Sequence, residues 1–241
     1  RRIRKAGGRY KLNIIVIGGG AAGLMAAGTA AEQGANVTLF ETNEKVGRKL
    51  FITGKGRCNV CNDCDAQEVL RNVPVNPRFL YSALGAFSPA DVKAFFEEKG
   101  VALKTERGNR VFPVSDRASD IIDALFLWVR RTGVSIVHAS VSDLVMQGGR
   151  VTGVRAGKKT CLADRVIVAT GGASYPQTGS TGDGYRFARE AGHTVVPANP
   201  SLVPLVESGE TCRSLMGLSL RNVQLTVFEN EKKIYTDFGE M

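Results

Sequence analysis

A glycine-rich turn directly after the first apolar run of the chain constrains the fold more than any other feature of the sequence. Residues 13–17, Asn-Ile-Ile-Val-Ile, form a short continuous apolar run, which is typical of a strand buried inside a parallel sheet. Glycines follow at once, and small helix-forming residues continue from 21 to 33 before Gly34. A second apolar run occupies 37–40. This order predicts a strand–helix–strand unit and therefore an α/β fold with a parallel sheet.

The turn itself, Gly18-Gly19-Gly20-Ala21-Ala22-Gly23, satisfies the dinucleotide-binding pattern G-x-G-x-x-G. Gly18 permits the tight turn, Gly20 lets a pyrophosphate approach the backbone, and Gly23 lets the helix pack closely on the strand. The helix begins at Ala21 and Ala22, where free N–H groups and the positive end of the helix dipole favour phosphate. These residues are therefore predicted to bind a dinucleotide.

An acidic residue lies at the end of the second strand, 18 residues after the last glycine of the turn. This separation is close to the roughly 20 residues expected of an acid that binds the ribose. We expect Glu41 to accept hydrogen bonds from ribose hydroxyls and to repel a 2′-phosphate. The turn and the acid together leave FAD and NAD as alternatives.

Two further glycine clusters follow another apolar run, at 165–169. The first cluster contains Thr170, Gly171 and Gly172, and the second, residues 179–184, opens an apparent helix at Asp183. Fixing glycine costs conformational entropy, so such clusters suggest positive φ or a ligand against bare backbone. The glycines alone leave open which ligand this is, and capping of the helix is the alternative role of Asp183.

The remaining chain predicts two further helices and several antiparallel strands. A helix begins at Ser88-Pro89, and another at 115–131 carries an apolar stripe on which Trp128 and Phe126 are expected in the core. Short runs at 141–146, 151–155 and 160–162 predict a β-meander. A proline-rich stretch begins near residue 195, and we place a domain boundary there. The predicted domains are 12–194, Rossmann-like, and 195–241, the start of a β-rich second domain.

The net charge of +9 does not by itself indicate a nucleic-acid-binding protein. Six of the 32 basic residues lie within the first 11 positions, which leaves 26 to face 23 acidic residues elsewhere. We interpret this leader as a solvated extension, with a nucleic-acid or targeting arm as the alternative. No apolar run reaches the roughly 18–20 residues that span a bilayer. The absence of an initial Met and the abrupt end at Met241 suggest a fragment.

Several motifs together resemble one flavoprotein family. The extended fingerprint that ends at Glu41, the segments Gly47-Arg48-Lys49-Leu50 and Gly56-Arg57-Cys58-Asn59, residues 110–115, and residues 171–176 through Gly192-His193 are similar to the aminoacetone-oxidase/BaiN-like FAD-dependent oxidoreductases. The resemblance covers 13 to about 225 and implies a glutathione-reductase-type FAD-binding domain followed by a β-rich insertion. It makes FAD the expected cofactor and implies that Thr170, Gly171, Gly172 and Asp183 contact it. The positive side chains of Arg48, Lys49 and Arg57 are expected to face its pyrophosphate or flavin ring, with ordinary surface charge as the alternative, and Val141 is placed with the cofactor-binding residues.

The resemblance implies hydride transfer through flavin N5. The donor is NAD(P)H if the substrate is a small or steroid-like unsaturated ketone, and an amine substrate itself if the protein is an oxidase. An NAD-dependent dehydrogenase and a nucleic-acid-associated flavoprotein are the rival functions. We expect a small-molecule substrate, and we expect neither a membrane nor, given the charge distribution, a nucleic acid as partner. No side chain is singled out as the catalytic acid, and the oligomeric state is left open.

Five cysteines, an odd number, exclude a complete disulfide framework and suit a reducing compartment, so the cytoplasm is expected. Three of them, Cys58, Cys61 and Cys64, have a spacing that also occurs in metal and iron–sulfur sites. A redox-active pair is the second alternative. We interpret the three as small packing residues and predict no metal.

Overall fold

The computed structural model describes residues 11–200 and 206–239, and the chain divides into two compact units, Arg1–Val195 and Val196–Met241. Of the basic leader, only Lys11 belongs to the described residues. Each unit is described by itself below.

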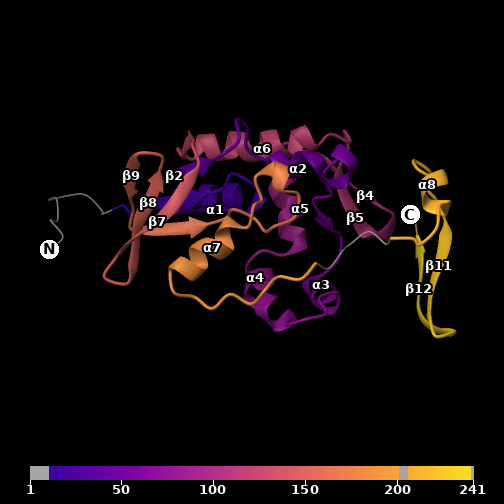
Figure 1. The fold of residues 1–241 in the computed structure, drawn as a ribbon. Coiled ribbons are helices and arrows are strands. Elements are labelled where there is room, and N and C mark those ends of the chain that lie inside the picture. Colours follow the sequence, from indigo (N-terminus) through magenta and orange to yellow (C-terminus); the bar gives the residue numbers. More distant parts are fainter. Residues whose placement is uncertain (1–10, 201–205, 240–241) are drawn as a thin grey trace, which may run out of the picture. The chain divides into compact units, whose positions relative to one another are not determined.

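The first unit is built on a parallel sheet of four strands in the order β10-β1-β2-β6 (Figure 1). Its strands are β1 (Asn13–Ile17), β2 (Asn36–Glu41), β6 (Ser135–His138) and β10 (Arg165–Val168). The pairing Ile17↔Phe40 and Ile17↔Val168 aligns the ends of three strands. Their carboxyl ends therefore meet at one edge of the sheet, where ligands of open α/β sheets bind.

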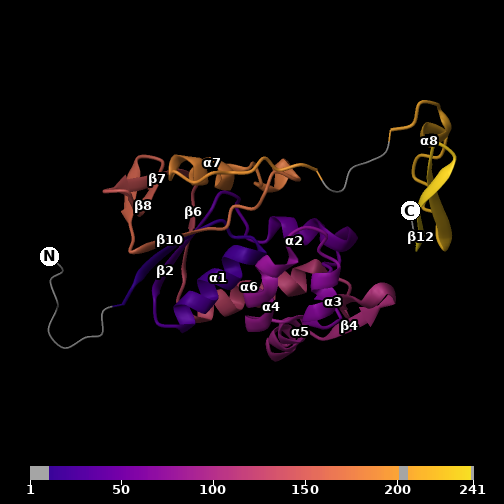
Figure 2. The ribbon, with the colours of Figure 1, turned by 90° about the horizontal axis from the view of Figure 1, so that it is seen from below.

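Helices α1 (Ala21–Glu32) and α6 (Ala118–Arg131) cover one face of this sheet (Figure 2). Val16 and Leu39 point into this layer and pack with Leu24 of α1 and Trp128 of α6, all buried. The helix predicted at 115–131 is confirmed from residue 118, and Trp128 belongs to the core as expected. The prediction for Phe126 is wrong, because this residue is 36% exposed.

A three-stranded antiparallel meander and helix α7 (Asp183–Glu190) lie on the opposite face of the sheet (Figure 2). The meander consists of β7 (Val141–Gln147), β8 (Arg150–Ala156) and β9 (Lys159–Leu162), as the alternating runs predicted. A second buried cluster joins Ile15 and Ile17 to Val154 and Phe187. Because successive side chains of a strand point to opposite faces, β1 contributes to both cores.

An excursion between β2 and α6 contains short elements that the sequence pattern did not indicate. Helix α5 (Pro89–Glu98) is the exception, since its capping box of Ser88 and Asp91 confirms the predicted start. The other elements of this excursion are α2 (Arg48–Ile52), η1 (Thr53–Gly56), β3 (Cys61–Asn62), α3 (Ala66–Arg71), η2 (Pro77–Leu80), α4 (Tyr81–Ala86), β4 (Leu103–Glu106), η3 (Arg107–Asn109) and β5 (Arg110–Pro113). Its three strands form a small antiparallel sheet in the order β3-β5-β4.

The second unit contains a short helix and one hairpin. Helix α8 (Thr211–Ser214) precedes β11 (Val223–Glu229) and β12 (Lys232–Gly239), which pair antiparallel with an irregularity between Val227 and Phe228. The strand expected from Val223 onward is therefore present.

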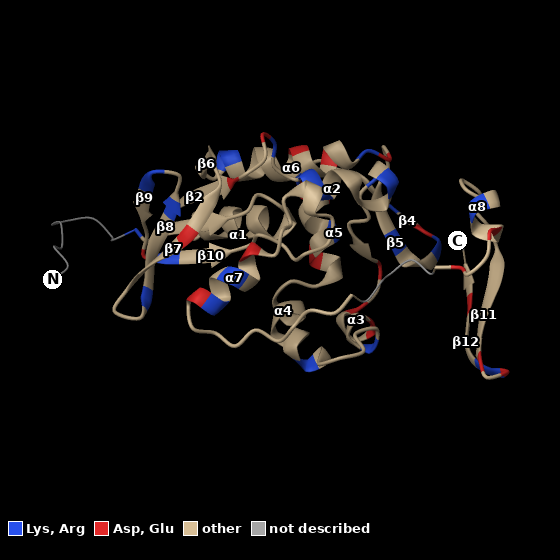
Figure 3. Cartoon of the chain, in the orientation of Figure 1, with Lys and Arg blue, Asp and Glu red and all other residues tan. Residues whose placement is uncertain are grey.

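Basic and acidic residues alternate along several elements of the first unit (Figure 3). Lys104 of β4 pairs with Asp116, and Arg186 of α7 pairs with Asp183. Across the described residues, no helix has both the length and the apolar character needed to cross a bilayer.

Candidate functional site

The turn from β1 to α1 exposes backbone N–H groups. Two of its glycines, Gly18 and Gly23, have no room for a side chain, and a third, Gly20, leaves open space beside the backbone. Gly18 has φ +103°, and a β-carbon there would lie 2.5 Å from the carbonyl oxygen of Ala169. A β-carbon at Gly23 would lie 1.7 Å from the carbonyl oxygen of Gly18, so the helix could not pack as closely on the strand. Gly20 precedes the helix, has open space beside it and provides no side-chain cap. The N–H groups of the first turn of α1 are thus left for a ligand.

The carboxylate of Glu41 is held beside this turn by three N–H donors. Its Oε2 accepts a hydrogen bond from the backbone N of Gly19 at 2.7 Å. Its Oε1 accepts two, from the backbone N and the side-chain Nδ2 of Asn43, at 2.7 and 2.6 Å. Glu41 is only 7% exposed, so these bonds replace most of the water around the charge. The acid at the end of β2 is therefore fixed in orientation.

A cavity of about 540 Å³ opens at the carboxyl ends of β1, β2 and β10. It brings together residues that are up to 170 positions apart in the sequence, and it has the size of a small-molecule or cofactor site. Among its walls are eleven of the residues predicted to bind the cofactor: Gly18, Gly20, Ala21, Ala22, Glu41, Arg48, Lys49, Val141, Thr170, Gly171 and Asp183.

The second pair of glycine clusters forms the wall of the cavity that follows β10. Gly171 has φ +76°, and a β-carbon there would meet the Ser180 hydroxyl at 2.7 Å. Gly184 leaves space for Thr170, whose Oγ1 would lie 2.9 Å from a β-carbon at 184. Thr170 Oγ1 is buried and has no hydrogen-bond partner among the described residues. A buried unpaired hydroxyl is costly, so this atom indicates a missing polar partner at the cavity wall.

Asp183 begins α7 and lies at the cavity with its carboxylate already bonded. The Thr181 hydroxyl donates to Oδ2 at 2.5 Å, and Arg186 Nη2 donates to Oδ1 at 3.1 Å. The hydrogen bond from Thr181 is the main reason that the pKa of this carboxyl is lowered, with Arg186 adding to the effect against partial burial. Asp183 therefore carries a negative charge at the N-terminus of α7, where the helix dipole favours it.

Two basic residues of α2 line the cavity. Arg48 Nη1 donates to Asn43 Oδ1 at 2.8 Å, and Lys49 Nζ donates to the carbonyl oxygen of Ser174 at 2.8 Å. The helix begins after Gly47, which has φ +74°. The structure thus brings both residues to the cavity, tied to loops that follow β2 and β10.

Three of the predicted residues do not line the cavity. Gly23 packs inside on Gly18, and Gly172 accepts a hydrogen bond from the N–H of Gly182 at 3.1 Å. Arg57 instead bonds both oxygens of Glu106, at 2.9 and 3.0 Å, and its guanidinium lies 4.0 Å from the ring centre of Phe112. This geometry gives Arg57 a role in holding the β4–β5 hairpin against η1.

Comparison with known proteins decides the family. A family model described as the HI0933-like protein Rossmann domain matches residues 12–240. The chain belongs to this HI0933-like family.

Curated relatives agree with this assignment. The chain is 35% identical over 192 residues to the 3-dehydro-bile acid delta(4,6)-reductase of Clostridium scindens, which covers 79% of this chain and 46% of the relative. It is 32% identical over 219 residues to the ribosomal RNA dihydrouridine synthase of Haemophilus influenzae, covering 88% and 53%. The HI0933-like chain thus spans about half the length of these relatives. The family resemblance predicted from the motifs is confirmed.

The fold is shared more widely. Mycobacterium smegmatis Sdh1 in complex with UQ1 superposes with a TM-score of 0.55 at 21% identity, covering 76% of this chain and 38% of that one. Identity at this level speaks for the fold alone. The predicted α/β class with a Rossmann-like parallel sheet is confirmed by this match and by the family model.

The HI0933-like chain also lines its cavity with residues that the motifs did not single out. Asn43, Thr178 and Phe187 all contribute to the walls. Asn43 follows Glu41 by two positions, Thr178 directly precedes the second glycine cluster, and Phe187 follows Asp183 by four positions. Proximity to a predicted ligand residue was the one signal available for them in the sequence.

The three closely spaced cysteines are protonated thiols in this fold. Burial raises the pKa of Cys61 to about 11 and also raises the pKa of Cys58, which is 1% exposed. The pKa of Cys64 is raised as well, first by desolvation and then by nearby carboxylates. Within residues 11–200 and 206–239, no three His, Cys, Asp or Glu side chains stand where they could hold a metal ion. A thiol of raised pKa is a poor nucleophile near neutral pH.

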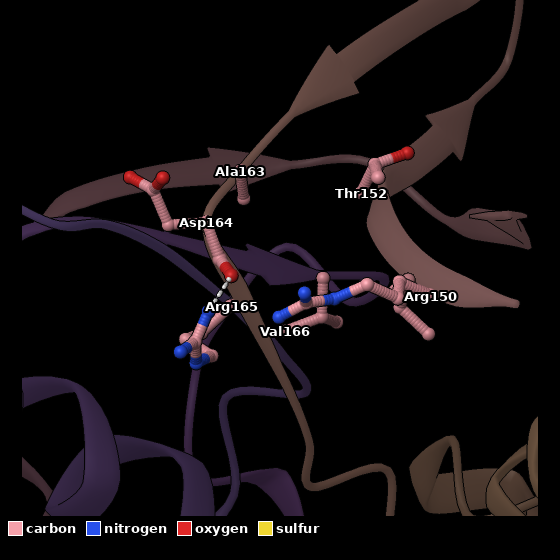
Figure 4. A pocket seen from close by; sticks show the side chains of 7 residues that line it. Arg150, Thr152, Ala163, Asp164, Arg165 and Val166 are labelled. Atoms are coloured by element: carbon pink, nitrogen blue, oxygen red, sulfur yellow. Dashed lines mark hydrogen bonds between the residues drawn. The ribbon is translucent and has the colours of Figure 1, made fainter. Parts of the chain in front are cut away.

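A second hollow, of about 560 Å³, lies between β8 and β10 on the meander side (Figure 4). Arg150 and Arg165 stand at its walls, and Arg165 Nη1 donates to the carbonyl oxygen of Asp164 at 2.7 Å. The carboxylate of Asp164 accepts from the backbone N of Asn13 at 2.9 Å. None of the predicted cofactor-binding residues lines this hollow, so the candidate site of the HI0933-like chain is the cavity at the strand ends.

Proposed function

We propose that this chain is the cofactor-binding part of an FAD-dependent oxidoreductase that reduces a carbon–carbon double bond conjugated to a carbonyl group. The observation that carries the proposal is the cavity at the strand ends, which combines a glycine turn, a fixed acid and an unpaired buried hydroxyl. The family and its curated relatives support it from a separate direction.

The described residues fit a flavin dinucleotide. The N–H groups of Ala21 and Ala22 bind the diphosphate, since a helix N-terminus next to bare Gly20 is an anion site. Glu41 accepts a hydrogen bond from the ribose, and Thr170 Oγ1 donates to the cofactor the hydrogen bond that it otherwise lacks. When bound, FAD supplies the hydride chemistry, while the protein supplies orientation and charge.

Lys49 and Asp183 complete the expected contacts from opposite walls. Lys49 is held by the carbonyl oxygen of Ser174, so its positive charge stays at the cavity wall and favours an electron-rich ring edge. Asp183 has a lowered pKa and remains an acceptor for hydroxyl groups. These roles, like those of Arg48 and Val141, follow from the position of each residue at the cavity wall.

The names of the two relatives share one reaction. A 3-dehydro-bile acid delta(4,6)-reductase acts on double bonds conjugated to a 3-oxo group, and dihydrouridine is uridine with its double bond, conjugated to a carbonyl, saturated. For this chain we infer that hydride adds to the electrophilic carbon at the far end of the conjugated system and that a proton from solvent completes saturation of that double bond. The substrate gains two hydrogens, and we take NAD(P)H as the reductant that becomes oxidised to NAD(P)⁺.

The test is a bleaching assay on the full chain. Purified protein should carry yellow flavin absorption, lose it anaerobically with NADH or NADPH, and regain it on addition of a conjugated ketone, with a product two hydrogens heavier. One arm uses a 4,6-dien-3-one bile acid and another uses uridine-containing RNA, which separates the two substrate classes. A third arm uses small amines, the other reaction expected from the sequence. Bleaching by an amine with no response to NAD(P)H would reverse the proposed direction of the reaction.

A further inference from the structure

A single side chain in the loop after β2 connects the predicted ribose-binding acid to the second glycine cluster. The Asn43 amide Nδ2 donates to Glu41 Oε1 at 2.6 Å and to the carbonyl oxygen of Thr178 at 3.2 Å. Its Oδ1 accepts from Arg48 at 2.8 Å. Its backbone carbonyl oxygen accepts from His138 Nδ1 at 2.8 Å, so that ring nitrogen carries the proton. The amide nitrogen of Asn43 thus donates and its amide oxygen accepts, a combination that a carboxylate at this position could not provide.

The bonds from Asn43 decide which oxygen of Glu41 is open to a ligand. A carboxylate has about four acceptor positions, two on each oxygen. Asn43 N and Nδ2 occupy both positions of Oε1, and Gly19 N occupies one of Oε2. One acceptor position remains, on Oε2. A ribose hydroxyl therefore meets an acid whose orientation and free position have been set by its neighbour.

Asn43 also fits closely against the wall formed by the second glycine cluster. A β-carbon at Gly179 would lie 3.0 Å from Asn43 Nδ2, and Gly179 has φ +95°. Gly179 follows Thr178, the residue whose carbonyl oxygen accepts from the same nitrogen. The amide therefore holds the turn at 178–179 at a fixed distance from the end of β2.

We infer that Asn43 is a positioning residue for the dinucleotide: it orients Glu41 for the ribose and fastens the wall after β10 to the wall after β2. This inference rests on the proposed binding of FAD. Asn43 itself is not required to touch the cofactor. Its neutral amide is essential, because one end must donate to a carboxylate while the other accepts from a guanidinium.

The variant Asn43→Asp tests the inference because it preserves the shape of the side chain and replaces the donating NH₂ group by an accepting oxygen. The new oxygen would face two acceptors, Glu41 Oε1 and the Thr178 carbonyl oxygen. At neutral pH we expect FAD to bind at least about tenfold more weakly, measured by quenching of flavin fluorescence, since a hydrogen bond to a charged group is replaced by repulsion. Asn43→Ala should lose affinity too, because Glu41 keeps one donor fewer.

The dependence on pH separates positioning from a general loss of structure. Two facing carboxylates share a proton as the pH falls, which restores a donor between them. Asn43→Asp should therefore regain FAD affinity relative to wild type between pH 7 and 5, whereas Asn43→Ala should not. The groups that can modify this response are Arg48 and His138, which contact Asn43, and Glu44, Lys45 and Asp123, which line the hollow beside it.

The variant Asn36→Asp serves as the matched control. Asn36 is the first residue of β2, at the opposite end of that strand from Glu41. It is exposed, and its amide donates to Asn13 Oδ1. Its conversion to Asp should leave FAD affinity within twofold of wild type. Equal affinities of Asn43→Asp and wild type at neutral pH would overturn the inference.

Hydrogen exchange of the ligand-free chain distinguishes this failure from failure of the proposed function. Asn43→Ala should speed exchange at residues 175–182 and leave β8 unchanged, because the bond to the Thr178 carbonyl oxygen is lost. If wild type binds no FAD, the proposed function fails, and the exchange result still decides whether Asn43 fastens the two walls. Unchanged exchange at 175–182 would show that it does not.

Discussion

The indole ring of Trp128 occupies the place that a side chain at Gly28 would take. A β-carbon at position 28 would lie 2.4 Å from two ring carbons, and the indole Nε1 donates to Glu32 Oε1 at 2.7 Å one turn further along α1. The two helices on the sheet are therefore joined by one aromatic residue that is both packed and hydrogen-bonded. Because both contacts lie on the α1–α6 interface, this interface has little room for adjustment.

Gly28→Ala should reduce the free energy of unfolding by about 1–3 kcal/mol, as overpacking of a filled core does. Urea unfolding of the purified chain measures the change. The matched control is Gly85→Ala, since Gly85 also lies in a helix but has open space beside it. There the better helix propensity of alanine should stabilise by up to about 1 kcal/mol. A stabilising Gly28→Ala would contradict the described packing.

Glu41→Gln should weaken FAD binding and also destabilise the ligand-free chain by about 1–3 kcal/mol. The carboxylate accepts three N–H bonds, and an amide nitrogen in the place of one oxygen leaves at least one of these donors unsatisfied. Thermal unfolding with and without FAD measures both effects. Glu44→Gln, an equal change of charge at an exposed neighbour, should do neither.

Thr170→Val should act in opposite directions without and with the cofactor. In the ligand-free chain it replaces a buried unpaired hydroxyl by a methyl group, so the free energy of unfolding should rise by about 1 kcal/mol. The additional stabilisation on saturation with FAD should fall, because the hydroxyl is the predicted donor. Thr152→Val provides the contrast, since Thr152 Oγ1 donates to the carbonyl oxygen of Val145 at 3.3 Å and its loss should only destabilise. A Thr170→Val chain that is less stable without FAD would refute the assignment of this hydroxyl.

The carboxyl of Asp183 predicts how stability depends on pH. Its pKa in the folded chain is lowered, chiefly by the Thr181 hydroxyl, so its contribution is present above the unfolded pKa of about 4 and is lost as the pH falls through the folded pKa. Asp183→Asn should therefore unfold at a lower temperature than wild type at pH 7. The two should converge below pH 4. A difference that does not change with pH would mean that the hydrogen bonds, not the charge, stabilise α7.

The strand–helix–strand unit was predictable because each sequence signal that specifies it is local. A continuous apolar run, a glycine turn and an acid at the next strand end suffice to specify β1, α1 and Glu41, and the structure has these elements within about one residue of the prediction. The meander followed from alternation in the same way. Local pattern and global fold agree there, as they do in consistent sequences.

The features that were missed depend on contacts between distant residues. Strand β3 has two residues and exists because Cys61 pairs with Val111, fifty positions away. Phe126 has an apolar side chain at helical spacing, but it is not among the buried residues of α6. Arg57 belongs to a motif shared with flavoproteins, and its position is set by Glu106. Short-range pattern carries no information about such partners.

The three donors around Glu41 also determine what cofactor capture costs. A free glutamate side chain gives up rotational freedom when a ligand orders it, at about 0.5–1.5 kcal/mol. Here that loss has already been taken during folding, through Gly19 and Asn43. In the proposed binding mode the ribose therefore meets an acid that is already oriented, and more of its hydrogen-bond enthalpy remains to offset immobilisation of the cofactor.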